Sequence, residues 1–269
     1  MSRLNIMKTK LKDALQQALP RSIRPRRILG GPLSGSWIVT SWRDYPAAIL
    51  GYTEIPLLDW FATSVRAGET WLDVGAHYGY TAIALCRLVG DTGRVYAFEP
   101  QVASAGCLGQ TRALNRLRQL TVIPLALGGL DELSIQSLPE TRGMVDSTVA
   151  ENSALVPFLA ANFDWLWPRI CGWQKQIDGV KIDVQGMEIE VLKGMTSILR
   201  GYRPKLAIEF HKGVPRKDLL TLLAAMNYSQ PGLPVDPLPG ESTPLYVDDR
   251  SYAFFPDEQA AYAKSIGPE

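Results

Sequence analysis

WLDVGAHYGYTAIAL, residues 71–85, is the stretch that decides the fold of this chain. It begins with an apolar run that holds an acid, Asp73, passes through a loop between Gly75 and Gly79, and becomes apolar again. This pattern predicts a buried strand, a tight turn and a helix. Because a buried acid is costly without a partner, Asp73 at the end of such a strand points toward a ligand.

The composition is that of a soluble globular chain. It has 269 residues, of which 46% are hydrophobic, enough for one large domain with an N-terminal extension. Lys and Arg together number 28 against 27 acids, so net charge indicates no polyanionic partner. Three scattered cysteines, Cys86, Cys107 and Cys171, predict buried or incidental thiols in a reducing compartment. With no signal peptide and no long apolar run, we expect a cytoplasmic protein.

The N-terminus is unusually basic. Residues 1–28 carry eight basic side chains and one acid, a charge of +7, which leaves 1 − 7 = −6 for the rest. Residues 3–18 have the apolar spacing of an amphipathic helix that Pro20 would end. Such a helix could contact an anionic membrane surface or dock on the rest of the chain as a lid, and we favour docking.

From residue 70 onward, strand-like and helix-like patterns alternate. Alternation of this kind predicts a mostly parallel sheet covered by helices on both faces. The stretch from Gly128 to Asp178 is predicted to be irregular, and the Pro- and Gly-rich stretch 230–244 to be a loop. Strands are expected at 70–74, 95–98, 120–127, 179–184, 205–210 and 251–255, and helices at 79–89, 102–117, 187–199 and 216–226.

An acid stands at the end of each of four predicted strands. These are Asp73, Glu99, Asp183 and Glu209, and His211 follows the last of them. Ligands of such sheets bind beyond the carboxyl ends of the strands, which meet at one rim. A single acid could be a helix cap, but four at one rim indicate a ligand site.

The sequence of the glycine loop restricts which class of ligand can bind. A dinucleotide fingerprint needs a central glycine where this chain has His77, and there is no phosphate-binding G-x-x-x-x-G-K-[ST] motif. A nucleoside without phosphates would use the same crevice, with Glu99 on its ribose. S-adenosylmethionine fits this description, and its positive charge suits an acidic rim.

Four segments resemble the FkbM family of S-adenosylmethionine-dependent methyltransferases: WLDVGAHYGYTAIAL, RVYAFEPQ, GVKIDVQGMEIEVLKGM and PKLAIEFH. Their order and spacing match from about Arg27 to Pro256, although the family usually has Asn at His77 and Glu at Gln185. The resemblance implies a Rossmann-like class I fold with a seven-stranded sheet and a reversed final strand. It also implies methyl transfer to a hydroxyl oxygen. It places the cofactor at Asp73, Gly75, Ala76, His77, Gly79, Tyr80, Glu99, Pro100, Ala126, Leu127 and Asp183.

Methyl transfer to an alcohol benefits from a base that takes the hydroxyl proton. His211 is our first choice, with Asp183 and Glu209 as orienting groups or alternative bases. His211 could instead only hold a loop by hydrogen bonds. The three residues could also share a divalent ion, but we expect no metal.

The acceptor is expected to be a hydroxyl of a small natural product, a sugar or a glycan. Residues 1–53 are expected to form an extension or lid, and 54–269 the methyltransferase domain. The stretch 128–178 is long for a connection and is expected to bind substrate. Its Trp165, Trp167 and Trp173 could pack on a ligand ring or form a local hydrophobic cluster. Trp37, Trp42 and Tyr45 could form the other wall.

Two other classes of function remain open. One is a catalytically silent protein that only binds S-adenosylmethionine, since fold alone does not establish activity. The other is a nucleic-acid methyltransferase. Against it, the chain has DVQG where base methyltransferases often have Asn/Asp-Pro-Pro-Tyr, and no basic patch outside 1–28. We expect no nucleic-acid partner, and the oligomeric state stays open.

Overall fold

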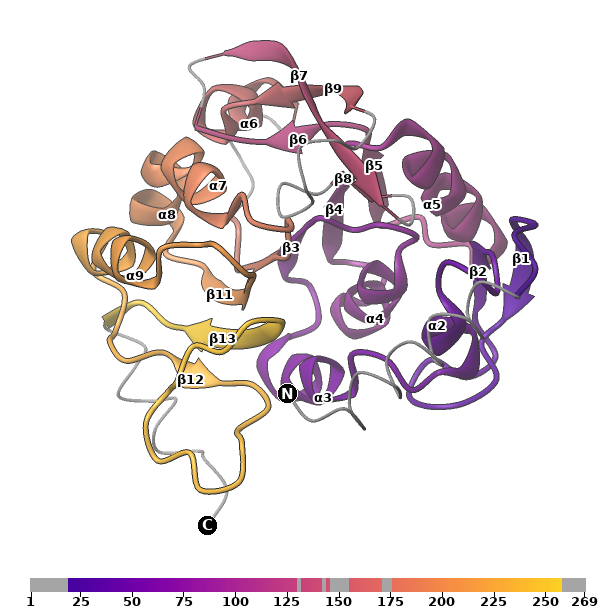
Figure 1. Cartoon of the computed structure of the whole chain (residues 1–269), viewed down its shortest axis with the longest axis horizontal. Coiled ribbons are helices and arrows are strands. Elements are labelled where there is room, and N and C mark those ends of the chain that lie inside the picture. The colour runs from indigo at the N-terminus through magenta and orange to yellow at the C-terminus, as the bar shows by residue number, and fades with distance from the viewer. Residues whose placement is uncertain (1–18, 130–131, 142–143, 146–154, 171–175, 258–269) are drawn as a thin grey trace, which may run out of the picture.

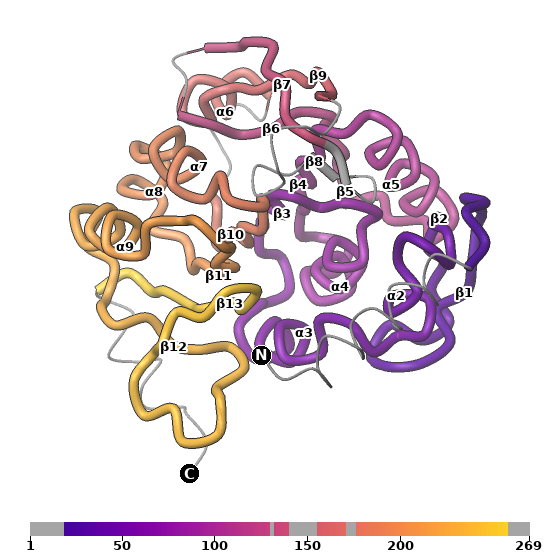
Figure 2. The backbone as a smooth tube through the Cα atoms, in the orientation of Figure 1, coloured from indigo at the N-terminus to yellow at the C-terminus, as the bar shows by residue number. Residues whose placement is uncertain are grey.

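A seven-stranded sheet forms the centre of the molecule (Figures 1 and 2). The computed structural model describes residues 19–129, 132–141, 144–145, 155–170 and 176–257. The strand order is β12-β13-β11-β10-β3-β4-β5, and β13 runs antiparallel to both of its neighbours. This confirms the class I methyltransferase fold with a reversed final strand. The strands are β3 (Thr70–Val74), β4 (Arg94–Phe98), β5 (Leu120–Ile123), β10 (Gly179–Ile182), β11 (Lys205–Phe210), β12 (Leu233–Pro234) and β13 (Arg250–Phe254).

Helices cover both faces of this sheet, as the alternation predicted. Successive residues of β3 point to opposite faces, so Trp71 and Leu72 belong to different hydrophobic clusters. In Figure 1, α7, α8 and α9 lie to the left of the sheet and α4 and α5 to its right. The helices are α3 (Ile55–Ser64), α4 (Tyr80–Val89), α5 (Val102–Leu114), α6 (Phe163–Ile170), α7 (Glu188–Gly194), α8 (Thr196–Tyr202) and α9 (Arg216–Ala225).

Several predicted boundaries were wrong, and two have a clear physical cause. The strand expected over 120–127 stops at Ile123, because Pro124 has no N–H to donate to a ladder. The helix expected over 187–199 is broken after Gly194, a poor helix former, into α7 and α8. Other helix and strand ends differ by one to three residues.

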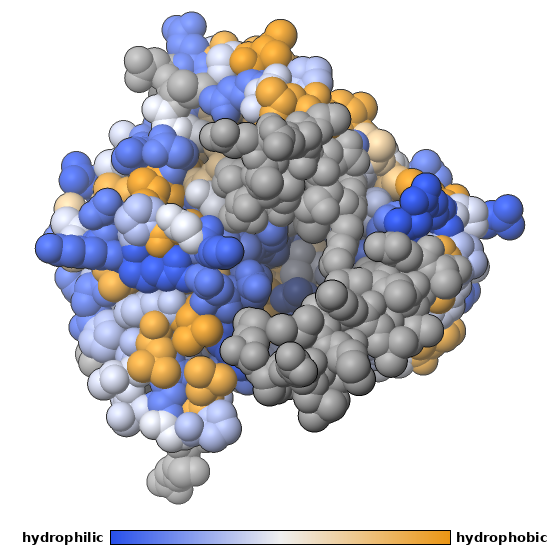
Figure 3. Space-filling view, viewed as in Figure 1, coloured by the Kyte–Doolittle hydropathy of each residue, from blue (hydrophilic) through white to orange (hydrophobic). Residues whose placement is uncertain are grey.

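The stretch 128–178 is not irregular, which corrects the prediction. Strand β7 (Leu133–Thr141) pairs with β9 (Leu155–Ala161), and both belong to a small sheet with β6 (Ala126–Leu127) and β8 (Met144–Val145). α6 follows and packs against α7 and α8. The stretch 230–244 also departs from a simple loop, because it contains β12. Strands β7 and β9 also carry exposed apolar residues, Leu133, Ile135, Leu155 and Leu159. These strands lie at the top of the view in Figure 1, and Figure 3 shows apolar surface there.

The N-terminal part of the described chain packs on the main domain. Strand β1 (Arg24–Arg27) pairs with β2 (Trp37–Thr40), and a short helix α2 (Pro46–Leu50) follows. The backbone N–H group of Trp37 donates to the side chain of Asn115, the C-cap residue of α5, at 2.8 Å, and that of Val39 donates to Thr111 of α5 at 2.9 Å. The helix expected over 3–18 lies outside the described residues.

The cysteines and the apolar character of the helices were also predicted from the sequence. Cys86 and Cys107 are buried free thiols, as predicted, while Cys171 lies outside the described residues. In the part of the chain that the structure describes, no helix combines the length and apolar character needed to cross a bilayer.

Candidate active site

A cavity of about 240 Å³ opens at the carboxyl ends of the central strands. Strands β3, β4, β10 and β11 all contribute residues to its wall, as expected for ligands of such sheets. Its lining residues are Asp44, Tyr45, Glu54, Val74, Gly75, Ala76, His77, Tyr80, Thr81, Phe98, Glu99, Pro100, Leu125, Ala126, Leu127, Lys181, Asp183, Val184, Gln185, Met187 and Glu209.

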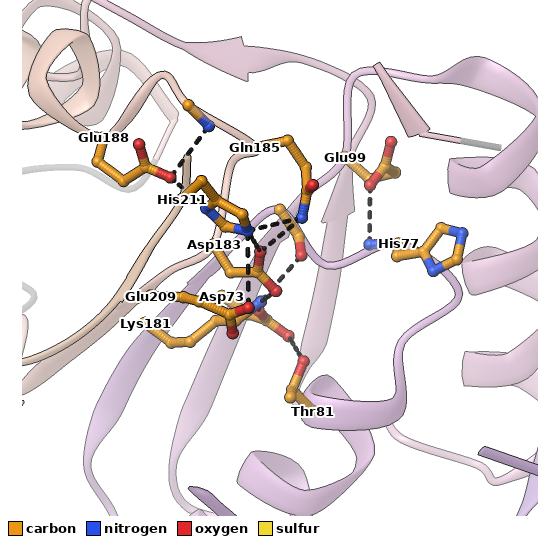
Figure 4. A network of polar contacts seen from close by, with 12 residues as sticks. Asp73, His77, Thr81, Glu99, Lys181, Asp183, Gln185, Glu188, Glu209 and His211 are labelled. Carbon is orange, nitrogen blue, oxygen red and sulfur yellow. Dashed lines mark hydrogen bonds and ion pairs between the residues drawn. The ribbon is translucent and has the colours of Figure 1, made fainter. Parts of the chain in front are cut away.

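A buried lysine, which sequence reasoning missed, ties the floor of this cavity together. The parallel register pairs Lys181 of β10 directly with Asp73 of β3. The Lys181 Nζ lies 3.2 Å from Asp73 Oδ1 and 3.3 Å from Asp183 Oδ2, and donates to the Gly75 carbonyl at 2.9 Å. Burial lowers the pKa of Lys181, but Asp183 and Asp73 more than offset this and raise it. Lys181 is therefore a fixed cation that joins the ends of β3 and β10 (Figure 4).

Asp73 acts on the cavity through its neighbours. It is fully buried and does not line the cavity. Its Oδ2 accepts a hydrogen bond of 2.7 Å from the Thr81 hydroxyl of α4, and its Oδ1 faces Lys181. Since Thr81 and Lys181 both line the cavity, Asp73 positions two wall residues from behind.

The two loop glycines have packing roles that the sequence did not reveal. A Cβ at Gly75, where φ is +82°, would lie 1.8 Å from the Asp183 carbonyl oxygen. A Cβ at Gly79, where φ is +91°, would lie 2.1 Å from Leu108 Cδ1 of α5. Gly75 lets the loops after β3 and β10 approach each other, and Gly79 lets α4 approach α5. Gly75 lines the cavity and Gly79 does not.

The two positions at which this chain departs from the family pattern share one backbone conformation. His77 has φ of +48° and Gln185 has φ of +53°, both in the left-handed region. Histidine and asparagine are among the residues enriched there, which explains how His77 fits where the family has Asn. Both residues line the cavity.

Glu99 is held rigidly at the end of β4. Its Oε2 accepts from the His77 N–H at 2.8 Å, and its Oε1 accepts from the Gln101 N–H at 2.9 Å. Burial raises the pKa of Glu99 to about 7, although these two bonds lower it. Each carboxylate oxygen keeps a second acceptor position, so the group can still take hydrogen bonds from a ribose.

His211 lies behind the cavity wall rather than in it. The ring is 3% exposed, and its Nδ1 lies 2.6 Å from Glu188 Oε1. Its Nε2 lies 2.8 Å from the Gln185 amide nitrogen, 3.4 Å from Asp183 Oδ1 and 3.6 Å from Glu209 Oε1 (Figure 4). Burial lowers the pKa of His211, but the bond to Glu188 and the charge of Asp183 raise it to about 9.

The two carboxylates beside His211 differ in basicity. Burial raises the pKa of Asp183, but Lys181 and His211 outweigh it, so that the pKa is lowered. Burial, Asp183 and Glu54 instead raise the pKa of Glu209 well above its ordinary value. Glu209 is therefore the stronger base of the two.

A divalent ion could be reached by one atom each of Asp183, Glu209 and His211, which lie within 4.8 Å of one another. However, the Gln185 amide nitrogen already lies where such an ion would sit, 2.8 Å from His211 Nε2 and 3.2 Å from Asp183 Oδ1. Lys181 also pairs with Asp183. We assign no metal to this cluster.

Most of the predicted site residues come together in the cavity. Asp73, Gly79 and His211 stand behind its wall instead. Sequence reasoning missed Asp44, Glu54, Thr81 and Lys181. Of these four, only Lys181 could have been recognised from the sequence, because it is a lone charged residue within an apolar strand. The predicted residues that line the cavity are Gly75, Ala76, His77, Tyr80, Glu99, Pro100, Ala126, Leu127, Asp183 and Glu209.

The aromatic residues of the expected substrate walls differ in placement. Trp167 is buried and packs on Tyr96 and Phe163, with ring centroids 5.1 and 5.3 Å apart, so for this residue the structure favours the hydrophobic-cluster interpretation. Tyr45 lines the cavity, whereas Trp37, Trp42 and Trp165 do not. Trp173 lies outside the described residues. The role of 128–178 in substrate binding stays a prediction.

A sheet of this order, with its cavity at the carboxyl ends of β3, β4 and β10, is the arrangement of class I S-adenosylmethionine-dependent methyltransferases. A carboxylate at the end of β4, without a phosphate-binding glycine pattern before it, agrees with that cofactor. The chain matches the family model described as "Methyltransferase FkbM domain" over residues 73–229, more than half of its length. The chain belongs to this family.

Known proteins resemble the chain to different extents. It is 31% identical over 160 residues to the hexuronic acid methyltransferase AglP of Haloferax volcanii, covering 58% of this chain and 62% of that protein. The solved structure of methyltransferase FkbM from Methylobacillus flagellatus is 16% identical, with a TM-score of 0.47, covering 79% of this chain and 52% of that one. A solved structure described as a putative rRNA-methylase from Clostridium thermocellum is 11% identical, with a TM-score of 0.47, and the match covers 74% of this chain and 92% of that one.

Proposed function

We propose that the chain is an S-adenosylmethionine-dependent O-methyltransferase that methylates a hydroxyl of a sugar, a glycan or a small natural product. The observation that carries the proposal is the cavity, because it combines a ribose-type carboxylate at Glu99 with a basic carboxylate at Glu209. The relative from Haloferax volcanii is named for a hexuronic acid, which favours a sugar as the acceptor.

Glu209 is the base in this proposal, and His211 is a positioning residue. Glu209 lines the cavity and has a raised pKa, so its ionised form binds a proton readily. His211 does not reach the cavity, and a pKa of about 9 leaves its ring protonated at neutral pH. This reverses the order of preference that the sequence suggested.

Methyl transfer then proceeds as an in-line displacement. With the methyl donor bound, Glu209 would take the hydroxyl proton of the acceptor, whose oxygen would form its bond to the methyl carbon as the bond from that carbon to sulfur breaks. S-adenosylmethionine, when bound, supplies an activated methyl group. The protein's main contribution is to hold the oxygen in line with it, which can supply much of the rate.

The chemistry of the methylated product tests the proposal. The protein is incubated with S-adenosylmethionine labelled in its methyl group and with glycans and small molecules extracted from the cells that produce it. We expect label in an alkali-stable methyl ether. Label released by mild alkali would indicate a carboxylate acceptor, and label on an amine would also overturn O-methylation of a hydroxyl. Absence of S-adenosylmethionine binding in calorimetry would overturn the cofactor.

A further inference from the structure

Part of the cavity wall comes from outside the family domain. The matched domain begins at residue 73, but Asp44, Tyr45 and Glu54 also line the cavity. Tyr45 precedes α2, and Glu54 is the N-cap residue of α3. The segment before the domain is therefore part of the binding site.

Glu54 is held in an unusual conformation for a helix cap. Its φ is +56°, in the left-handed region that disfavours residues with large side chains. Its side chain makes no capping hydrogen bond to α3, and the residue lines the cavity. Costly backbone conformations of this kind cluster at active sites and ligand clamps.

A second polar group meets Glu54 there. Tyr80, the first residue of α4, lines the cavity and is 2% exposed, yet its hydroxyl has no hydrogen-bond partner among the described residues. Glu54 lines the same cavity, and burial, followed by the charge of Glu54, raises the pKa of Tyr80. A buried hydroxyl without a partner is costly, so a ligand atom is expected at this position.

This end of the cavity has more acidic groups than basic ones. The charges of Asp183 and Asp73 raise the pKa of Glu54, and that of Lys181 lowers it. The charge of Glu54 in turn raises the pKa of Glu209. Lys181 is the nearby ammonium, and it is already bonded to Asp73, Asp183 and the Gly75 carbonyl. The charged groups that face Glu54 therefore favour a ligand with a positive charge.

The sheet order fixes which part of the cofactor lies here. Glu99 follows β4, and Leu125–Leu127 follow β5 at the edge of the sheet, which places ribose and adenine on that side. The other end of the cofactor then lies over β3 and β10, beside Asp73, Lys181 and Asp183. That end carries the amino acid of the methionine tail, with its primary ammonium group.

We propose that the Glu54 carboxylate and the Tyr80 hydroxyl form a subsite for a primary ammonium group, and that this subsite binds the α-ammonium of the cofactor's methionine tail. The inference rests on the proposed function, because it requires this cofactor in the cavity. In this proposal Glu54, which precedes the family domain, belongs to the cofactor site.

Two nucleosides that differ only in the tail isolate this subsite. S-adenosylhomocysteine carries the amino-acid tail, and 5′-methylthioadenosine lacks it, so calorimetry is used to measure the dissociation constants of both. Glu54→Gln should weaken S-adenosylhomocysteine about 10- to 150-fold, the range for a hydrogen bond to a charged group, while 5′-methylthioadenosine stays within about twofold. Tyr80→Phe should show the same selectivity with a smaller loss, about 2- to 13-fold.

Two further variants serve as references. Asp59→Asn changes an exposed acid of α3 and should leave both dissociation constants unchanged. Glu99→Gln should weaken both nucleosides by the same factor, because both carry the ribose. Equal weakening of the two ligands by Glu54→Gln, or no weakening of either, would overturn the ammonium subsite. If the unmodified protein bound neither nucleoside, the proposed function itself would fail, and the two failures are therefore distinguishable.

Discussion

Replacing Lys181 with methionine probes the central ion pairs of the fold. Methionine has a similar volume but no charge, so the change removes the cation and leaves the two acids. The side chains of Lys181 and Asp73 are 4% and 0% exposed, and that of Asp183 is 23% exposed. Removing one partner of a buried ion pair costs about 3–5 kcal/mol, and we expect Lys181→Met to lower the free energy of unfolding by this amount at pH 7.

The loss should depend on pH in a defined direction. In the unmodified protein Lys181 helps to depress the pKa of Asp183, so this acid stabilises the fold above its unfolded pKa, and that stability is lost as the pH falls. Without Lys181 the pKa of Asp183 rises in the folded state, and protonation then relieves the unpaired charge on this acid. The difference between variant and unmodified protein should therefore be largest near neutral pH and should shrink toward pH 4.

Urea unfolding followed by circular dichroism at pH 7 and at pH 4.5 measures both effects. Lys193→Met is the matched control, because Lys193 is 54% exposed and pairs with Glu190 on the surface of α7. Its effect should stay within about 0.5 kcal/mol. A loss below about 1 kcal/mol for Lys181→Met at pH 7, or an equal loss at both pH values, would refute the reasoning.

Three further predictions concern other parts of the site. The affinity for S-adenosylhomocysteine should rise between pH 6 and 8 as Glu99, with its pKa near 7, ionises, and Glu99→Gln should flatten this profile; a wild-type profile already flat in calorimetry would contradict it. Gly75→Ala should destabilise the fold by at least about 1–3 kcal/mol, while Gly106→Ala, in a helix with open space around it, should stabilise it by about 0.5–1 kcal/mol; thermal unfolding compares them. If Glu209 is the base, kcat should rise with pH as its carboxyl group ionises, and Glu209→Gln should lower kcat about 10²- to 10⁴-fold and remove this rise. His211→Asn should shift the rise to higher pH, because it removes a nearby cation that lowers the pKa of Glu209. A near-native kcat in Glu209→Gln would exclude Glu209 as the base.

The sequence was sufficient for the main strands and for the rim of acids. Apolar runs that end in an acid, as at Asp73 and Asp183, mark buried strands and their carboxyl ends without knowledge of neighbours. The contact between Asp73 and Lys181 depends on the register of β3 against β10, which one strand's pattern does not encode. The roles of Gly75 and Glu54 likewise depend on what another loop or helix brings close.

The same limit explains the errors in the helices. The spacing of apolar residues over 187–199 favours one continuous helix across Gly194, because these residues would share one face of it. A Cβ at Gly194 would lie 1.9 Å from the Gly128 carbonyl, so the glycine is placed there by a contact between distant segments. His211 shows the limit for chemistry, since a histidine at the end of a strand can face the cavity or the core behind it.

The side-chain bonds from α5 to β2 bear on how the protein behaves at high concentration. A strand with free N–H groups along one edge can recruit a strand from another molecule and begin aggregation. On one edge β2 pairs with β1, and on the other Trp37 and Val39 donate to Asn115 and Thr111. Helix side chains thus take the place of a neighbouring strand, and this edge is closed to intermolecular β-sheet growth.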